Sequence, residues 1–579
     1  MSTPLEVKRA CDRCRRRKIK VKVRLIIQCL VSSIFQPDDE TLTPEQCYSP
    51  QIRSAVMDRR LICAPVRLYQ PIPCSYDLPI GKRGPKGQRT QRQARSHVAI
   101  LETSTLGELC DSGRPQFDGL AVLERLQREL KEAIQHEVPR IPVGTIAQHC
   151  ISIHFRRSFP ILHEPSMRAD ATYFFGADDE IPPTYLAEYA GKDGLTLMRS
   201  FAVLTALCAA QSFLHARSTL PYGAAVGPKF LRAARCMLRE YEDDDRRDPD
   251  ATSLQIRMLL STSLQQYAGE NGLAWHLVGE AGLIARRMRL YNESAVSQYS
   301  PLEATMLRNA FWMLYVADAS ATCMKNRAVI LHEPLFDSDM DLATFGMNQV
   351  PLLESENIDT PGEFEVNISQ AFHQMRRTWV AAARLMLAIR EYGRLKSDNN
   401  PPELAFDSSQ FSNITQMYSQ FDASLDDIPA TLQPSVVFGQ DDDTVMEEGR
   451  SCYISLRYRL LSAYYYAKLM IIHECRHLGL TSMVGFRDDD SVLNGEEINV
   501  ARDFINNLQS IPFHYLEELG EPVIEVMRGV GSILLAISQK SENALTRRRA
   551  LSQLNVLLDV LARLDSQASN KLTTQLSQA

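Results

Sequence analysis

Residues 302–325 have the sequence LEATMLRNAFWMLYVADASATCMK, in which apolar side chains recur at spacings of three and four residues. This period matches the 3.6 residues per turn of an α-helix and not the two-residue alternation of a β-strand. Phe311, Trp312 and Tyr315 supply bulky aromatic rings, and such rings usually fill the interior of a helix-packed core. The stretch therefore predicts a long helix that is buried in an all-α domain.

The same helical period continues through most of the chain after residue 145, and strand-like alternation is weak throughout. The segments with a clear helical pattern are 145–158, 196–216, 228–242, 252–268, 273–290, 302–325, 366–392, 450–478, 496–508, 521–540 and 544–565. Acid-rich or Pro- and Asn-rich breaks, which predict surface loops, lie at 243–250, 335–364, 396–409 and 424–449. We therefore expect a mainly α protein with a large all-α helical domain over 145–400 that continues as a C-terminal helical part over 401–579.

Composition places the chain among ordinary intracellular globular proteins. Of its 579 residues, 45% are hydrophobic and 23% are charged, which excludes wholesale disorder. Thirteen cysteines are too few for a disulfide scaffold, and no cleavable N-terminal signal is evident, so we expect reduced thiols. We take 25–35 as the longest apolar stretch of the sequence. It is too short to span a bilayer, so no membrane partner is expected.

Charge is distributed unevenly along the chain. Residues 1–100 contain 20 Lys and Arg against 8 Asp and Glu, whereas the other 479 residues contain 44 and 62. Two basic clusters, 8–24 and 82–95, account for most of the positive charge of the head. A cationic head on an anionic body indicates that the head binds a polyanion. A basic tail without a specific partner is the alternative.

The first basic cluster contains two cysteines at metal-ligand spacing. Cys11 and Cys14 are separated by two residues, and five of the six residues after Cys14, all except Ile19, are cationic. Two thiolates at this spacing at a helix start can bind one zinc ion, with Zn–S distances of about 2.3 Å. The following helix would present Arg and Lys to the major groove of DNA, where these side chains donate to guanine O6 and N7.

The head resembles the DNA-binding domain of the fungal Zn2Cys6 binuclear-cluster transcription factors. That family has the pattern C-x2-C-x6-C, a short loop, and C-x2-C-x6-8-C, and its six thiolates hold two zinc ions. Cys11 and Cys14 match its first and second cysteines, Cys63 and Cys74 match its fourth and sixth, and the tail KRGPKG at 82–87 is common in the family. The resemblance implies a head over 1–88 with zinc as cofactor and these four cysteines as zinc ligands.

The resemblance also implies roles for the cations of the head. Arg17 and Lys18 occupy the positions at which the family reads bases. The cations expected to contact mainly phosphate are Arg15, Arg16, Lys20, Lys82, Arg83 and Lys86. Residues 15–20 could also serve as a nuclear-localisation signal, so the nucleus is the expected compartment.

Two ligand positions of the family pattern are not cysteine in this chain. Val21 stands at the third position and Val66 at the fifth, and neither can bind zinc. An atypical insert at about 21–62 replaces the short loop and brings Cys29 and Cys47 at other spacings. One hypothesis is a retained intron or an incorrect gene model, because valine codons begin with GT, as introns do. The alternative to a zinc-binding head is a broken cluster.

Residues 89–144 combine a linker with a short amphipathic helix. Glycine and proline punctuate polar sequence up to about 116. The apolar residues that then recur at threes and fours are Phe117, Leu120, Leu123, Leu126, Leu130 and Ile134, and the pattern ends before Pro139. Two or three heptads are marginal for a coiled coil, so this helix either dimerises or docks on the body.

The body resembles the middle homology region of fungal transcription factors, a regulatory domain. Three motifs carry the resemblance in the family's order: FPILHEP at 159–165, AWHLVGEAGLIARRM at 274–288 and RNAFWMLYVAD at 308–318. The loop that follows, with Asn326, Arg327, Asp337, Asp339 and Asp341, resembles that of the family. The residues that predict close helix packing rather than ligand contacts are Trp275, Gly279, Gly282, Phe311, Trp312 and Tyr315.

The sequence also contains a zinc peptidase signature. Residues 473–477, HECRH, fit H-E-x-x-H, and Glu496 lies at a plausible spacing for a third ligand. On a helix, His473 and His477 would share one face and Glu474 could act as general base. The motif ends a Tyr- and Leu-rich helix at 452–472, and a helix C-terminus favours His and Arg. We therefore favour a capped core helix and expect no enzyme.

These features predict a nuclear, zinc-dependent, sequence-specific DNA-binding regulator of RNA polymerase II transcription. Expected partners are double-stranded DNA, a second copy of the chain in a homodimer, and the transcription machinery or coactivators. Two zinc ions per head are expected for the family. The alternatives are a helical regulatory protein with a defective head that acts through protein partners and, remotely, an HExxH zinc peptidase.

Overall fold

The computed structural model divides the chain into two units, Met1–Asp111 and Ser112–Ala579. The residues that it describes all belong to the second unit, and they are 119–176, 189–215, 219–268, 271–325, 327–346, 349–354, 361–398, 408–434, 437 and 447–564. The predicted head over 1–88, including its cysteines and its basic clusters, lies outside these residues.

The described part of the body consists of helices and loops, without a β-strand. Its α-helices are α3 (Gly119–Glu137), α4 (Val143–Arg157), α5 (Glu164–Phe175), α7 (Gly194–Leu214), α8 (Gly223–Arg247), α9 (Ala251–Ala268), α10 (Asn271–Arg287), α11 (Glu293–Val296), α12 (Pro301–Met324), α13 (Pro361–Asp398), α14 (Ser408–Asp422), α16 (Glu447–His477), α17 (Asp490–Gln509), α18 (Phe513–Leu519), α19 (Glu521–Lys540) and α20 (Ala544–Leu564). Four 3-10 turns also lie in these residues: η1 (Glu333–Leu335), η3 (Ala423–Leu425), η4 (Ala430–Leu432) and η5 (Thr481–Val484). The mainly α class predicted for the body is confirmed, and each segment with a clear helical pattern forms a helix.

Helix α12 shows how the local sequence sets its ends. Ser300 caps the first turn, because its side chain accepts a hydrogen bond from the backbone N–H of Glu303 at 3.3 Å, and Pro301 occupies a first-turn position. At the other end Lys325 adopts a left-handed conformation with φ 56°. The residues between these caps form the helix that the sequence predicted at 302–325.

The acid-rich segment 243–250 was predicted as a break, and this is wrong for its first half, because α8 continues to Arg247. Ion pairs between residues about one turn apart explain why the helix continues through this acidic segment. Arg246 lies 2.6 Å from Glu242 and Arg247 lies 3.0 Å from Asp244, so neighbouring turns compensate the charges. Helices α5, α14 and α18 were also not predicted, since α5 and α18 are short and α14 begins in a segment assigned to a loop.

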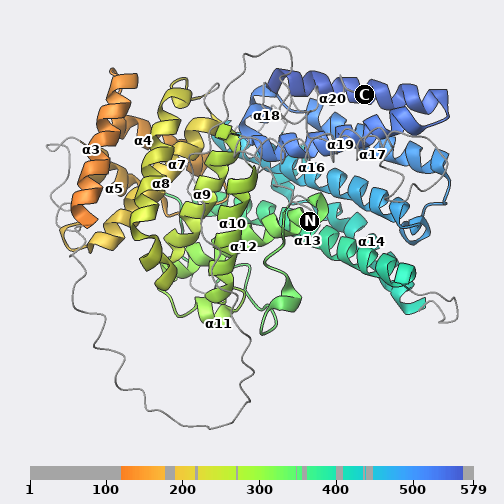
Figure 1. The fold of residues 1–579 in the computed structure, drawn as a ribbon, viewed down its shortest axis with the longest axis horizontal. Coiled ribbons are helices and arrows are strands. Elements are labelled where there is room, and N and C mark those ends of the chain that lie inside the picture. The colour runs from red at the N-terminus through yellow and green to blue at the C-terminus, as the bar shows by residue number, and fades with distance from the viewer. Residues whose placement is uncertain are drawn as a thin grey trace, which may run out of the picture. The chain divides into compact units, whose positions relative to one another are not determined.

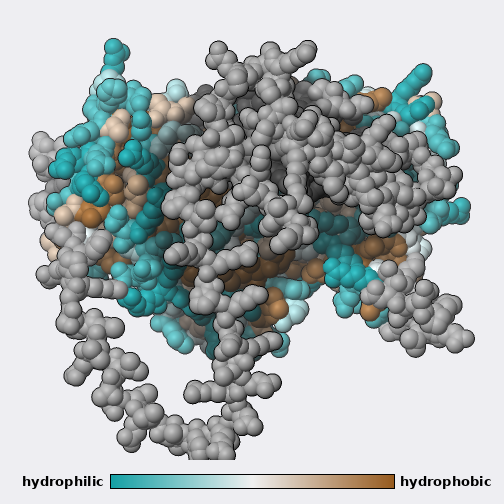
Figure 2. All heavy atoms as spheres, viewed as in Figure 1, coloured by the Kyte–Doolittle hydropathy of each residue, from teal (hydrophilic) through white to brown (hydrophobic). Residues whose placement is uncertain are grey.

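Helices that are close in sequence pack against one another through the body (Figure 1). Helix α7 packs against α8 and α9, α9 against α10, and α12 against α13. Helix α13 then packs against α14 and α16, and α16 against α17, which contacts α19 and α20. Hydrophilic side chains cover much of the coloured surface at the left of Figure 2. Helices α4 and α18 contact α16 and also α7, so the early and late helices share one core.

Helix α3 docks on the body through its apolar stripe. Leu123, Leu126, Leu130 and Ile134 are buried, and α3 packs against α8 and α7. Because these side chains already contact the body, they are not free to form the seam of a coiled-coil dimer. The structure therefore decides between the two alternatives in favour of docking.

Helix α7 is the most apolar helix of the described body. It is long and apolar enough to cross a membrane, but 83% of that stretch is buried in the protein. Its apolar sequence is explained by burial among α4, α5, α8 and α9. The prediction that 25–35 is the longest apolar stretch is therefore wrong, because the apolar segment of α7 is longer.

Candidate functional site

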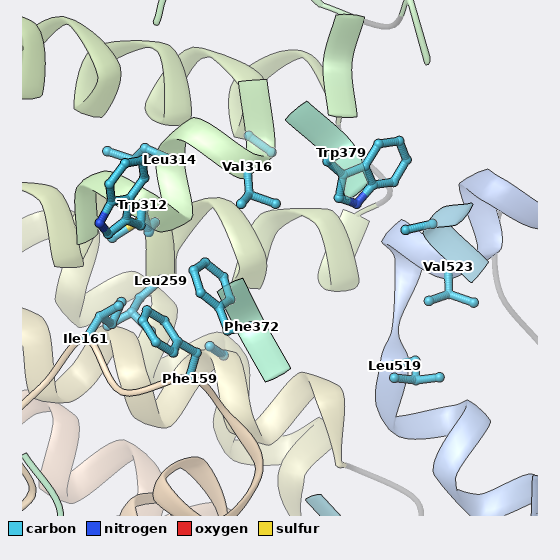
Figure 3. Close-up of a cluster of buried hydrophobic side chains, with 14 of the residues drawn as sticks. Phe159, Ile161, Leu259, Trp312, Leu314, Val316, Phe372, Trp379, Leu519 and Val523 are labelled. Atoms are coloured by element: carbon cyan, nitrogen blue, oxygen red, sulfur yellow. The ribbon is translucent and has the colours of Figure 1, made fainter. Parts of the chain in front are cut away.

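The loop at 159–165 is held in the centre of the body by buried polar side chains. Asn309 of α12 donates to the carbonyl of Pro160 at 2.8 Å, and Gln255 of α9 donates to the carbonyl of Ile161 at 2.7 Å. Phe159 stacks on Phe372 of α13 with ring centroids 3.9 Å apart (Figure 3). The motif therefore joins α9, α12 and α13, which satisfies the backbone of a loop that is buried away from water.

The aromatic residues of the α12 motif lie where the sequence predicted them. Phe311 is fully buried, Trp312 is 2% exposed and Tyr315 is 6% exposed. Trp312 Nε1 donates to the carbonyl of Ala343 at 3.0 Å, and Asp318 Oδ2 accepts from the backbone N–H of Ile330 at 2.6 Å. These bonds fix the loop that follows α12 against the helix that precedes it.

The glycines of the α10 motif allow that loop to approach closely. A Cβ atom added to Gly279 would lie 3.2 Å from Ile330, and one added to Gly282 would lie 3.3 Å from the same side chain. Trp275 differs from the prediction of a core residue, because it is only half-buried and its ring lies under the guanidinium of Arg327 at 4.8 Å. A cation–π contact with the largely buried Arg327 side chain thus replaces purely apolar packing there.

The acidic residues after α12 bind neighbouring segments instead of forming a cluster. Asp337 accepts a hydrogen bond from Tyr291 and pairs with Arg289, and Asp341 accepts from the backbone N–H of Glu293 at 2.8 Å. Hydrogen bonding from Tyr291 lowers the pKa of Asp337. These carboxylates therefore anchor the loop to the segment between α10 and α12.

The HExxH motif lies at the C-terminal end of α16, and its side chains face different partners. Glu474 accepts from Lys325 Nζ at 2.6 Å and from Arg390 Nε at 2.9 Å. Burial by itself raises the pKa of Glu474, but these hydrogen bonds outweigh it and lower the pKa. His473 Nδ1 lies 3.1 Å from Glu497 Oε1. Glu474 is thus a partner of α12 and α13, not a base beside the histidines.

The two histidines of the motif lie close to each other and to Glu497. His477 Nε2 lies 3.0 Å from His473 Nε2, and burial together with His473 lowers the pKa of His477. Glu497, the carboxylate that contacts His473, also binds Arg476 at 2.9 Å. Among the described residues, no group of three or more His, Cys, Asp or Glu side chains is arranged to hold a metal ion. This arrangement supports the interpretation of the motif as the capped end of a core helix over its interpretation as a peptidase site.

Replacing Glu474 with glutamine separates the two interpretations of this motif. We expect the free energy of unfolding to fall by about 1–3 kcal/mol, because two cations lose a largely buried carboxylate. Thermal unfolding would measure the loss, and a peptide hydrolysis assay should show no activity before or after the change. Glu496→Gln is the matched control and should leave the stability within about 0.5 kcal/mol. Hydrolysis by the parent chain that either substitution abolishes would instead support a peptidase.

The residues predicted to bind zinc or DNA are all outside the described part of the chain. They are Cys11, Cys14, Cys63, Cys74, Arg15, Arg16, Arg17, Lys18, Lys20, Lys82, Arg83 and Lys86. Within the described body six cysteines are free, and five of these are buried. Burial raises the pKa of Cys323, Cys452 and Cys475 to about 12, so these thiols stay protonated in the core.

Comparison with known proteins agrees with the architecture of the body. Residues 152–426 match the family model described as the fungal specific transcription factor domain. The match includes the 159–165 loop, the α10 and α12 motifs and α13, and it confirms the resemblance of the body. No curated protein and no solved structure matches the chain. An all-α body with this domain indicates a fungal transcription regulator, a class that generally acts in the nucleus and is generally not enzymatic.

Proposed function

We propose that the chain is a sequence-specific, DNA-binding regulator of RNA polymerase II transcription whose head requires zinc. The match of residues 152–426 to the transcription factor domain is the observation that carries the proposal. The head adds the C-x2-C pair followed by a basic block, and the block contributes to the separation of charge between head and body. A cationic segment beside an acidic body is suited to the phosphate backbone of DNA.

In this proposal Cys11, Cys14, Cys63 and Cys74 hold zinc, and the metal fixes the start of the basic helix. Arg17 and Lys18 read base edges in the major groove, and the remaining cations of the head contact phosphates. Because Val21 and Val66 offer hydrocarbon where the family has thiolates, we expect fewer than two zinc ions per chain.

A zinc and DNA titration of the full chain tests this function. Metal analysis should find zinc, and a GC-rich duplex should bind with an affinity that falls steeply between 50 and 200 mM salt, by roughly 10³-fold if about six phosphates are contacted. Cys14→Ser should lose the zinc and reduce the affinity to the non-specific level, because metal binding and folding of such a head are coupled. Cys29→Ser, which lies in the insert, is the matched control and should change neither.

The two valines at ligand positions support a second candidate function, that of a helical regulatory protein with a defective head. A chain that binds no zinc and ignores duplex DNA at low salt would overturn the proposal. It would then act through protein partners by means of its helical body. In either case the body carries the regulatory part of the function.

A further inference from the structure

A small pocket opens between α12, α13, α14 and the loop that follows α12. Its volume is about 270 Å³, close to the lower end of the roughly 300–1,000 Å³ that is usual for ligand sites. The residues that line it are Tyr315, Met340, Arg376, Arg377, Val380, Ala381, Arg384, Met417 and Gln420. Three of these are arginines of α13, and four are apolar side chains. The pocket thus combines a cationic wall with an apolar one.

The positive charge of the pocket is only partly compensated. Arg384 pairs with Glu333 at 2.7 and 3.0 Å, and the hydroxyl of Tyr315 donates to the same carboxylate. Among the described residues, no carboxylate oxygen lies within 4.0 Å of a guanidinium nitrogen of Arg376 or Arg377. Two cations therefore face the pocket without an acidic partner in this part of the protein.

Arg376 is held in position by contacts that leave hydrogen-bonding capacity unused. Its guanidinium lies 4.0 Å from the centre of the Trp312 ring, and its Nη2 donates to Thr344 Oγ1 at 3.4 Å. Its Nε is buried without a hydrogen-bond partner among the described residues. Burial, together with the nearby Arg377, lowers the pKa of Arg376 to about 10. The guanidinium of Arg376 thus carries a largely buried charge that no carboxylate of the described residues compensates, so an anion bound to it in the pocket would stabilise this arrangement.

We propose that this pocket binds a small organic anion. Its carboxylate or phosphate group would be held by Arg376 and Arg377, and its apolar part would pack against Met340, Val380 and Met417. Arginine is suited to this role because its planar guanidinium binds such groups with paired, charge-assisted hydrogen bonds. The pocket belongs to the body, so this inference is independent of whether the head binds zinc or DNA.

Calorimetric titration of the full chain at low salt with four probes tests the proposal. Hexanoate and hexyl phosphate carry an anion on the same apolar chain, hexanamide is the neutral control, and inorganic phosphate lacks the chain. We expect hexanoate and hexyl phosphate to bind, the better of the two identifying the anion, and both to weaken as sodium chloride is added. Hexanamide and inorganic phosphate should each bind at least about tenfold more weakly.

Two substitutions on α13 locate the site. Arg377→Gln removes an exposed cation of the pocket and should weaken hexanoate binding by about tenfold or more. Arg394→Gln removes an exposed arginine further along the same helix and should have no effect. Arg376→Gln should weaken binding at least as strongly, with thermal unfolding as a check on its fold. The proposal is wrong if neither anion binds, if hexanamide binds as tightly as hexanoate, or if Arg377→Gln and Arg394→Gln behave alike.

Discussion

Replacing Asp245 with asparagine should lower the free energy of unfolding of the helical body by about 3–5 kcal/mol. Asp245 and its partner Arg257 have side chains that are 0% exposed, and Arg257 Nη1 lies 2.6 Å from Asp245 Oδ2. Asparagine keeps the shape but removes the charge. The guanidinium of Arg257 would then remain buried with its main counter-charge lost, which is the costly way to break a buried pair.

The effect should be large because Asp245 connects three helices. Ser253 of α9 donates to Asp245 Oδ1 at 2.6 Å, and Arg199 of α7 lies 3.5 Å from the same oxygen. Arg257 also reaches Glu280 of α10 at 3.2 Å, which is partly exposed and so compensates less. Loss of one carboxylate therefore weakens the contacts of α8 with both α7 and α9.

Urea denaturation followed by circular dichroism would measure this effect, with Asp244→Asn as the matched control. Asp244 precedes Asp245 directly, but its side chain is 50% exposed and pairs with the exposed Arg247, so its loss should cost less than about 1 kcal/mol. The double variant Asp245→Asn with Arg257→Met should be more stable than the single variant, because it removes the orphaned charge. Equal shifts for the two neighbouring aspartates would refute the argument.

Restoring cysteines at both valine positions of the head should produce the second large effect. With Val21→Cys and Val66→Cys in the full chain, we expect two zinc ions per chain where the parent holds fewer. DNA affinity should rise as well, because a complete set of six thiolates holds the start of the basic helix more firmly than four do. Metal analysis and anisotropy titration at a fixed salt concentration would measure both.

This prediction assigns the defect of the head to its missing ligands and not to the length of the insert. The entropy of closing a loop grows slowly, by only about 0.6 kcal/mol for each doubling of its length. A structural zinc ion contributes roughly 10–16 kcal/mol in small zinc domains at neutral pH. The 41 residues between Val21 and Cys63 are therefore a tolerable cost once six thiolates are present.

Val23→Cys in place of Val21→Cys is the matched control for this experiment. It adds a thiol two residues away, outside the spacing of the family pattern, and should not raise the zinc content to two. If the parent chain already holds two zinc ions, Cys29 and Cys47 must serve as ligands, and the assignment of the defect to the two valines is wrong.

Local sequence was sufficient to predict most helices of the body. The apolar period at 302–325 corresponds to α12, and the same reasoning located α7, α13 and α16. It failed at 243–247, where an acidic run forms the last turn of α8. The helix continues there because Arg246 and Arg247 compensate the acids and because Asp245 is buried against Arg257. The second of these contacts joins two helices and leaves no local signal.

In the candidate sites, too, local sequence indicated part of the outcome and packing between helices decided the rest. The sequence indicated that HExxH was more consistent with a helix end than with a peptidase, but only packing shows that Glu474 faces Lys325 and Arg390. The arginine pocket was not predicted at all. Its only signal was the recurrence of Arg376, Val380 and Arg384 every four residues on a predicted helix, a pattern that is equally typical of a solvated face.

The amino-acid sequence by itself determined the helical class of the body, the motifs that match a transcription factor domain, and the four cysteines and basic residues that point to a DNA-binding head. The helical class follows from neighbours within one or two turns, where spacing fixes which side chains share a face, whereas the motifs and the roles of the head residues follow from resemblance to known families. Only the tertiary structure decided that α3 docks, which charges pair across helices, and that Arg376 and Arg377 line a pocket. Those outcomes depend on contacts between residues far apart in the chain, because a helix surface acquires its partners only when other helices pack against it.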